Sequence, residues 1–570
     1  NGVHPEQILM LSFSRRGAAD LRRRVAEGLE RSFTTLPAST FHSLALRLLE
    51  AYGDAPGAPA LLTGPEQVAL VSDVLAAEDP ADWPLLYRGL LGTATFADEV
   101  ADFVLRCREH LIDPAGLREQ AAERGQWRAL PAFLERYLAE LRERRRIDYG
   151  SLQAEAVSLL ADPEVQAAVA DQHPYVLVDE YQDTTLAQAR MLERLTRVRR
   201  NLTVAGDPYQ SIYSFRGAEV TNIAEFPAAF RDADGAPARR LVLSTSFRVP
   251  AEILEAAVRV TSGGDLPGAA GPVLPAPGRG SVEAYGFDQL THEAEWIAGE
   301  IERIHLRDGT PYRMMAVLVR SKRHLLPELS RALERRGVPH DSPDTRLADH
   351  PAVRLVLDCG RASIDVDVDG AVRRILMGSL VGLPLSAWRD LRRRRAADGT
   401  SWADAIRRDV PGGAALAGIL DDSAWAKAAP AAEGFWLLWS SLPQFAEAAT
   451  DPRRIADRAA WSSLAQVRGR LGERDPAATL ADYLRWSESE DFEATPLLEY
   501  RRADEDRLTL TTLHQAKGRG WDVVFIADAR EGVFPDLRAR ESLLGARFLS
   551  DTQPEDPAEY ARFRLQEERR

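Results

Sequence analysis

Two short apolar runs, each followed at once by polar residues suited to phosphate chemistry, constrain the fold of this chain most strongly. Tyr175 to Val178 leads into Asp179-Glu180-Tyr181-Gln182-Asp183, and Leu202 to Ala205 leads into a second polar segment that begins at Gly206. The residues between the two runs have apolar side chains at helical spacing. A helix between two strands predicts parallel strands whose carboxyl ends meet at one edge of a sheet. Because ligands bind outside that edge in such sheets, the sequence places a ligand site there.

Alternating strand and helix patterns recur along the chain and divide it into domains. At 570 residues the chain is too long for one hydrophobic core. All-helical stretches interrupt the alternation, with Trp83, Trp127, Phe133, Leu134 and Tyr137 as expected core anchors of the first stretch. The pattern predicts an α/β fold with two parallel-sheet domains, each with an inserted all-α subdomain. The first domain comprises residues 1–60 and 161–261 with the insert 61–160, and the second comprises 262–364 and 490–570 with the insert 365–489.

Five further strands are expected from short apolar runs. They are Leu241–Leu243, Ser281–Phe287, Met315–Val319, Leu508–Thr512 and Val523–Ala527.

Composition excludes several classes of protein. The net charge of -14 argues against a protein that simply coats nucleic acid, although a local basic stripe would suffice to grip phosphates. The two cysteines, Cys107 and Cys359, are too few and too far apart for a disulfide framework and are expected to be buried reduced thiols. There is no run of about 18 apolar residues and no signal-peptide pattern. The sequence therefore predicts a cytoplasmic protein without a membrane segment.

Asp179 and Glu180 lie where the first apolar run ends. Such a pair suits nucleotide hydrolysis, with Asp179 holding Mg²⁺ through its water shell and Glu180 accepting a proton from the attacking water. The alternative is a strand that merely ends in solvated acids. The agreement of the neighbouring segments favours the hydrolytic interpretation.

The segment from Gly206 to Ala218 combines two kinds of chemistry. The amide of Gln210 can donate and accept, which suits the orientation of water and the sensing of a γ-phosphate. Tyr213, Phe215 and Arg216 offer stacking faces and a cation, as single-strand platforms do. Taken alone, aromatic residues at this spacing are more often part of a core. Their linkage to Gln210 favours a platform.

Together these segments resemble the Walker B motif and the third motif of superfamily 1 helicases of the UvrD/PcrA/RecB group. The resemblance spans essentially all 570 residues and implies two RecA-like domains, ATP and Mg²⁺ as cofactors, and single-stranded and double-stranded DNA as partners. Asp179 and Glu180 match the metal and base positions, and Gln210 matches the γ-phosphate-sensing position. Gln182 is assigned to the nucleotide site with them, and Phe215 stands where the family usually has a base-stacking tryptophan.

Earlier and later motifs follow in family order. The resemblance implies that Phe13 stacks on a base, that Thr40 and His42 belong to the next DNA-contact motif, that Phe247 packs on adenine and that Arg248 is an arginine finger. Without the family resemblance, the sequence would predict a core position for Phe13, a turn position for His42 and a surface position for Arg248.

Residues Thr511 to Gly518 resemble the fifth motif, which touches the strand and the nucleotide. Thr512 and His514 are assigned to DNA, and Lys517 and Gly518 to the nucleotide. Gly520 departs from the pattern, because the family commonly has a Glu there that contacts the ribose. Weakened nucleotide affinity is the expected consequence.

The chain contains no G-x-x-x-x-G-K-[ST] phosphate loop, and its only lysines are Lys322, Lys427 and Lys517. The loop is expected upstream of Asn1 and the sixth motif, with its second arginine finger, beyond Arg570. The chain is thus interpreted as an interior fragment that alone hydrolyses essentially no ATP. The amino-acid sequence around Trp521 and from Glu531 to Pro535 is most similar to that of the helicase half of AdnAB-type helicase-nuclease subunits. This similarity implies a second helicase-nuclease subunit as a partner.

The resemblance implies an ATP-dependent DNA translocase and helicase core, moving 3′ to 5′ on single-stranded DNA in repair or recombination. One alternative is a helicase-like structural subunit that binds DNA or a partner without hydrolysis, which Gly520 favours and the intact Asp179-Glu180 pair disfavours. Another, a P-loop regulator without helicase activity, leaves Phe13, Tyr213 and Phe215 unexplained.

Overall fold

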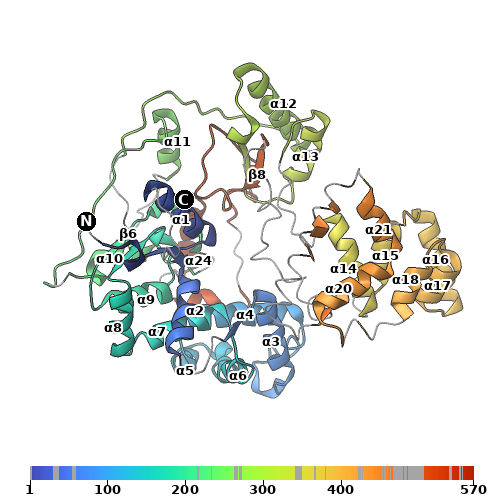
Figure 1. Cartoon of the computed structure of the whole chain (residues 1–570), viewed down its shortest axis with the longest axis horizontal. Coiled ribbons are helices and arrows are strands. Elements are labelled where there is room, and N and C mark those ends of the chain that lie inside the picture. The colour runs from blue at the N-terminus through green and yellow to red at the C-terminus, as the bar shows by residue number, and fades with distance from the viewer. Residues whose placement is uncertain are drawn as a thin grey trace.

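The structure is a computed structural model of the chain (Figure 1). Helices α14 to α21 form a body set apart at the right of the view, while the two sheets and the first group of helices lie together on the left. The residues described are 3–29, 38–53, 59–214, 217–232, 234–261, 268, 273–340, 350–364, 368–378, 381–421, 425, 428–451, 454, 457–458, 460–462, 464–465, 479–480, 484, 506–537, 542–550, 554 and 556–569.

The first sheet has four parallel strands in the order β2-β1-β5-β6. Leu9 of β1 pairs with Val176 of β5, which pairs in turn with Leu202 of β6. The central strand β1 is almost wholly buried because helices cover it, and Leu9 and Leu11 are both 0% exposed. The two strands expected to begin at Tyr175 and at Leu202 are therefore confirmed. The elements are β1 (Ile8–Ser12), α1 (Arg15–Leu29), β2 (Ala38–Thr40), α2 (Phe41–Tyr52), β5 (Tyr175–Val178), α9 (Leu186–Thr196), β6 (Leu202–Val204), α10 (Thr221–Ala229) and α11 (Ala251–Thr261).

A helical group interrupts the first sheet between β2 and β5. Its five expected core anchors are each at most 1% exposed, which confirms them, and a short parallel pair, β3 with β4, lies where the chain enters and leaves. The elements are β3 (Ala60–Leu61), α3 (Gly64–Ala76), α4 (Ala94–Glu109), α5 (Pro114–Glu123), α6 (Leu130–Glu143) and β4 (Arg146–Ile147). Helices α7 (Tyr149–Leu159) and α8 (Pro163–Gln172) follow, and their larger buried apolar side chains lie in the core of the first sheet.

The second sheet is also parallel, with the order β8-β7-β9. Val317 at the centre of β7 pairs with Leu510 on one side and with Phe525 on the other. Every residue of β7 is buried, because α12 and α13 pack against the sheet. The fold is thus α/β with two parallel sheets, as the sequence predicts. The elements are α12 (Leu290–Asp308), β7 (Met315–Val319), α13 (Leu325–Arg335), β8 (Thr509–Thr512), β9 (Val523–Ala527) and α24 (Pro557–Arg569).

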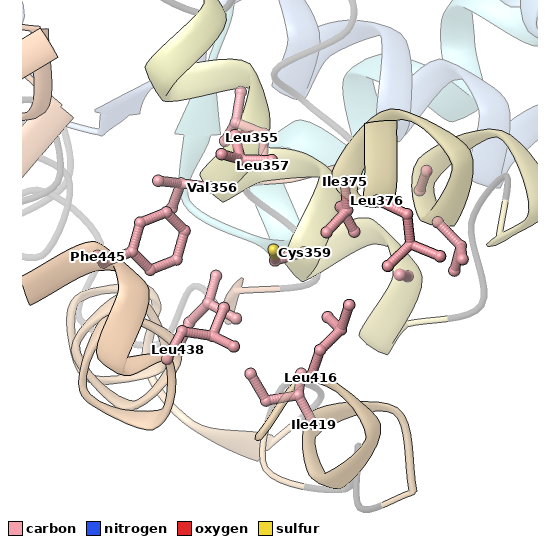
Figure 2. Close-up of a cluster of buried hydrophobic side chains, with 14 of the residues drawn as sticks. Leu355, Val356, Leu357, Cys359, Ile375, Leu376, Leu416, Ile419, Leu438 and Phe445 are labelled. Carbon is pink, nitrogen blue, oxygen red and sulfur yellow. The ribbon is translucent and has the colours of Figure 1, made fainter. Parts of the chain in front are cut away.

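The second helical group packs around a core of its own (Figure 2). Cys359 lies in this core near Phe445 and Leu438, and Cys107 lies in the first helical group; both thiols are free and buried, and burial raises their pKa. Among the described residues no helix is both long enough and apolar enough to cross a membrane. The elements are α14 (Pro351–Ser363), α15 (Val368–Met377), α16 (Leu385–Asp398), α17 (Trp402–Asp409), α18 (Ala414–Asp421), α20 (Ala431–Ser441) and α21 (Pro443–Thr450).

Two expected strands are wrong. Residues Leu241–Leu243 and Ser281–Phe287 have no strand conformation, and Leu241 and Leu243 are 71% and 90% exposed. Apolar composition makes a strand only where a neighbouring strand completes the hydrogen-bond ladder. Among the described residues, Thr245 supplies only an isolated bridge to Leu274.

Residues 542–550, here called the strap, follow the second sheet in sequence but pack into the first helical group. Leu544 is 0% exposed there, and Ala546 and Leu549 belong to the same core as Trp83 and Trp127. Their position in the sequence, within residues 490–570, predicts that they belong to the second domain. In space the strap joins that domain to the helical insert of the first.

Asp148 is expected to be a strong determinant of the stability of the first helical group. It begins α7 and accepts hydrogen bonds from Tyr137 Oη (2.9 Å), Ser151 N (2.7 Å) and Ser151 Oγ (2.9 Å) in a fully buried site. Asp148→Ala leaves these buried donors without an acceptor and should lower the free energy of unfolding by about 3 kcal/mol. The matched control is Asp113→Ala, an exposed cap of α5, which should cost about 1 kcal/mol. Urea-dependent hydrogen exchange of α7 and α5 measures both, and equal losses would contradict the assignment.

Candidate functional site

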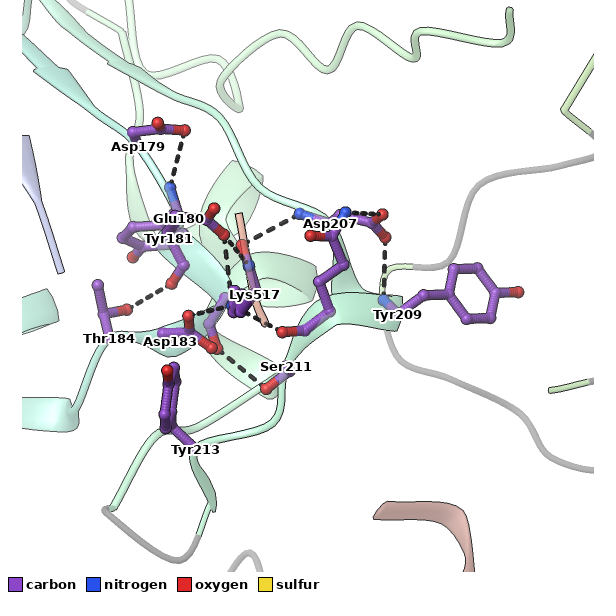
Figure 3. A network of polar contacts seen from close by, with 12 residues as sticks. Asp179, Glu180, Tyr181, Asp183, Thr184, Asp207, Tyr209, Ser211, Tyr213 and Lys517 are labelled. Atoms are coloured by element: carbon purple, nitrogen blue, oxygen red, sulfur yellow. Dashed lines mark hydrogen bonds and ion pairs between the residues drawn. The ribbon is translucent and has the colours of Figure 1, made fainter. Parts of the chain in front are cut away.

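The first part of the site is the sharp turn at the end of β5. Asp179 N donates to Leu11 O of the neighbouring strand, and Glu180 adopts a left-handed conformation with φ of 57°. That conformation costs a non-glycine residue about 1 kcal/mol or more. Glu180 N donates to Asp179 Oδ1 at 3.0 Å, and Figure 3 shows the two carboxylates pointing in different directions. The turn thus separates the expected metal carboxylate from the expected base.

Gln182 is fully buried and connects the two polar segments. Its Nε2 donates to Glu180 Oε2 at 2.6 Å, and its Oε1 accepts from Asp207 N at 3.0 Å. Gly206 makes this approach possible, because a Cβ there would lie 2.6 Å from Gln182 Oε1. The structure therefore places Gln182 where it orients the expected base.

Lys517 lies in the loop that follows β8 of the second sheet, and Figure 3 shows its side chain beside Glu180 and Asp183. Its Nζ lies 3.3 Å from Glu180 Oε2, donates to Gln210 O at 2.7 Å and forms an ion pair with Asp183. The amide of Gln210 in turn donates to Asp207 Oδ2 at 2.9 Å. One ammonium group thus joins the expected base, the expected phosphate sensor and a buried carboxylate.

Burial changes the acidity of two carboxyl groups in the site. It raises the pKa of Asp179, and the nearby charge of Glu180 raises it further. Burial also raises the pKa of Asp183 to about 6, against the opposing effect of Lys517. Sequence reasoning did not assign Asp183 a role. Its place in the Asp179 to Asp183 segment was the available signal.

The donor set fits Mg²⁺ in the manner expected of nucleotide-dependent enzymes. Mg²⁺ prefers oxygen ligands and is usually held by one or two carboxylates together with substrate phosphates and water. Asp179 supplies such a carboxylate at the strand end, whereas the described residues contain no cluster of three or more His, Cys, Asp or Glu that could hold a metal. The side chains therefore suit a metal that arrives with a phosphate group.

Aromatic residues adjoin the Lys517 contacts. The rings of Phe13 and Tyr213 stack with centroids 5.1 Å apart, and Tyr213 Oη donates to His514 O at 3.4 Å. Lys517 Nζ lies 5.4 Å from the centre of the Tyr213 ring. The expected strand platform and the expected hydrolytic residues thus share one lysine. Phe215 and Arg216 lie outside the described residues.

Other predicted residues occupy supporting positions. Thr40 is buried and caps α2 by accepting from Ser43 N, and Thr512 Oγ1 donates to Gln515 Oε1 at 3.2 Å. His42 Nε2 lies 2.7 Å from Gln153 Nε2. Gly518 has a φ of 77°, which favours glycine.

Phe247 and Arg248 lie on an exposed segment, with Phe247 89% exposed. The second sheet approaches them at Gly520, where a Cβ would lie 3.8 Å from Arg248 Cδ. The missing side chain at Gly520 thus faces the expected arginine finger.

The two parallel sheets, joined where their strands end by the Lys517 contacts, define a protein with two RecA-like domains. The family model of the UvrD/REP helicase N-terminal domain matches residues 1–231, and that of the UvrD-like helicase C-terminal domain matches residues 493–570. The chain belongs to the UvrD/PcrA type of superfamily 1 helicases.

Curated relatives match along nearly the whole chain. The ATP-dependent DNA helicase PcrA of Staphylococcus aureus (strain NCTC 8325 / PS 47) is 25% identical over 571 residues, which cover 95% of this chain and 73% of the relative. The protein of the same name from Staphylococcus epidermidis (strain ATCC 12228 / FDA PCI 1200) is 24% identical over 569 residues, with the same coverage. The finer likeness to AdnAB-type subunits stays a prediction.

The protonation of Asp183 is expected to control the Lys517 contact. Lys517 lowers the pKa of Asp183, so withdrawal of Lys517 would raise that pKa above about 6. Protons therefore favour the separated arrangement, and the contact should strengthen as the pH rises through about 6. The measurement is acetylation of Lys517 relative to Lys322 on the same chain, from about pH 5 to about pH 8. The ratio should fall with rising pH and should lose this dependence in Asp183→Asn. A constant ratio in the unmodified chain would contradict the coupling.

Proposed function

We propose that this chain is the core of an ATP-dependent DNA translocase and helicase that moves 3′ to 5′ on single-stranded DNA in repair or recombination. The observation that carries the proposal is the position of Lys517, which contacts the expected base Glu180 and lies against the expected strand-binding ring Tyr213. Membership of the family supports the helicase activity, and the polarity follows from the family resemblance.

Glu180 is the base in the proposed hydrolysis. Its carboxylate would take a proton from the attacking water, and the hydrogen bond from Gln182 fixes the position of Oε2. Asp179 would hold Mg²⁺, which supplies charge stabilisation to the phosphates when it is bound. Gln210 would orient water and sense the γ-phosphate, and Arg248 would stabilise the charge that develops there.

Lys517 would couple this chemistry to the strand. Its ammonium pairs with the carboxylates of Glu180 and Asp183 in the arrangement seen here, so Lys517 would have to move for Glu180 Oε2 to meet an attacking water. The same movement changes the contacts of Tyr213, because its hydroxyl is held by His514 O, three residues before Lys517. Hydrolysis and grip on the strand would therefore alternate.

Replacing Glu180 tests the chemistry. In the full-length protein, Glu180→Gln removes the proton acceptor and should lower strand-stimulated ATP hydrolysis by at least about 100-fold while sparing DNA binding. The matched control is Glu193→Gln, a surface residue of α9 paired with Arg190, which should leave the rate unchanged. Undiminished turnover in Glu180→Gln would refute its role as the base. A wild-type protein that binds strands but shows no stimulated hydrolysis would instead support the structural-subunit alternative.

Replacing Phe13 tests the strand-binding face. Phe13→Ala removes a stacking surface and should weaken affinity for single-stranded DNA by about 1–3 kcal/mol, or roughly 5- to 150-fold. The control is Trp436→Ala, which removes an exposed aromatic side chain from α20 in the second helical group. Titration of a fluorescent oligonucleotide measures both variants, and equal affinities would contradict the platform.

A further inference from the structure

The last turn of α4, in the first helical group, lies against the segment that carries Tyr213. Arg106 Nη1 donates to Glu109 Oε2 at 2.7 Å, and the two side chains are only 14% and 10% exposed. The same two bonded atoms crowd Gly217, where a Cβ would lie 2.8 Å from Arg106 Nη1 and 2.7 Å from Glu109 Oε2. A buried ion pair of the helical insert therefore rests directly on the backbone of Gly217.

Gly217 belongs to a tight turn of the expected strand-binding segment. Its N donates to Ser214 O at 2.9 Å, and Ala218 N donates to Tyr213 O at 3.2 Å. Gly217 has a φ of 79°, in the left-handed region that favours glycine. The ring of Tyr213 stacks on that of Phe13. The contact at Gly217 is therefore linked through two main-chain hydrogen bonds to the residue that carries the platform ring.

The same turn is anchored at its other end to the segment that follows β5. Glu219 N donates to Thr184 O at 3.1 Å, and Asn222 Nδ2 donates to the same oxygen at 2.9 Å. The carboxylate of Glu219 also lies 3.8 Å from His110 Nδ1, in the residue that ends α4. The turn is thus held by the first sheet at Thr184 and by the helical insert at Gly217 and Glu219.

We propose that Arg106 and Glu109 are positioning residues for strand binding, because their buried ion pair holds the turn at Gly217 and with it the Tyr213 ring of the platform. The proposal rests on the proposed function, since it requires that Phe13 and Tyr213 contact the strand. Without the ion pair, the turn would have to be ordered when a strand binds, and that cost weakens binding. The helical insert thereby contributes to the strand-binding site of the first sheet.

The ion pair should respond to pH. Burial raises the pKa of Glu109 to about 7, against the opposing effect of Arg106. Among the described residues, the other charged groups that face Glu109 are Asp102 on α4 and Asp148 at the start of α7. Burial and Arg106 lower the pKa of the adjacent His110 to about 4, so His110 stays neutral near pH 7. The ion pair is therefore present above about pH 7 and lost below it, and strand affinity should rise with pH through that value.

Glu109→Gln tests the proposal, because glutamine has nearly the shape of glutamate and is neutral at every pH. Titration of a fluorescent single-stranded oligonucleotide at constant salt measures the affinity of the full-length protein from about pH 6 to about pH 8.5. The unmodified protein should bind at least about fivefold more tightly than Glu109→Gln at the upper pH and within about twofold of it at the lower. The matched control, Asp102→Asn, removes the half-exposed partner of Arg106 and should keep both the affinity and its pH dependence.

The outcomes of this titration are distinct. Equal affinities of the unmodified protein and Glu109→Gln at every pH would overturn the proposal. A loss in Glu109→Gln that stays constant with pH would overturn it as well, because it would show only that the substitution disturbs the structure. An unmodified protein that binds no strand at any pH would refute the proposed function instead.

A second test uses the close approach at Gly217 and needs no titration. Gly217→Ala and Gly235→Ala both place a Cβ on a left-handed glycine, but Gly235 has nothing within 4 Å of that Cβ. Gly217→Ala should weaken strand binding at least about tenfold, and Gly235→Ala should leave it unchanged. Adding Glu109→Ala to Gly217→Ala should weaken binding no further, because both changes act on one contact. Losses that multiply in the double variant, or no loss in Gly217→Ala, would overturn the proposal.

Discussion

The ammonium group of Lys517 is the contact on which the arrangement of the site depends. Its side chain is only 9% exposed, and it meets a carboxylate of Asp183 that is 1% exposed. Removing one member of such a pair leaves the other charge buried without a partner, which is far costlier than losing a surface ion pair. The strands β5 and β8 end within a few residues of Glu180 and Lys517, so this one pair fixes the carboxyl ends of both sheets against each other.

The same contact determines what the carboxylates can do. A lysine held between Glu180, Asp183 and a carbonyl oxygen occupies one oxygen of the expected base. The left-handed turn at Glu180 directs Asp179 away from the lysine, so the expected metal carboxylate stays outside the pair. The neighbouring acids Asp179 and Glu180 therefore have different partners because of one backbone angle. This separation would allow Asp179 to hold a metal while Glu180 accepts a proton.

Much of this fold could be predicted from the sequence, because its signals are local. Met315 to Val319 is buried on both faces and reads as an unbroken apolar run, and Phe133, Leu134 and Tyr137 of α6 follow one another at helical spacing. The failures are non-local. Leu241 to Leu243 has the composition of a strand but lacks a neighbouring strand among the described residues. In the sequence nothing distinguishes Asp183 from the neighbouring acids. In the structure it pairs with a lysine 334 residues away. Leu544 looks like a loop residue until it meets Trp127, 417 positions earlier.

The two inter-domain contacts differ in chemistry, and that difference sets which one opens first. Lys517 and its acceptors can exchange their hydrogen bonds for water or for a phosphate, so their separation can be compensated. The strap is held by buried apolar side chains, whose exposure to water is not compensated by any new bond. A relative motion of the domains should therefore begin at Lys517 and turn about the strap. Such a motion would change the site of hydrolysis and the Tyr213 platform while the strap keeps its place in the first helical group.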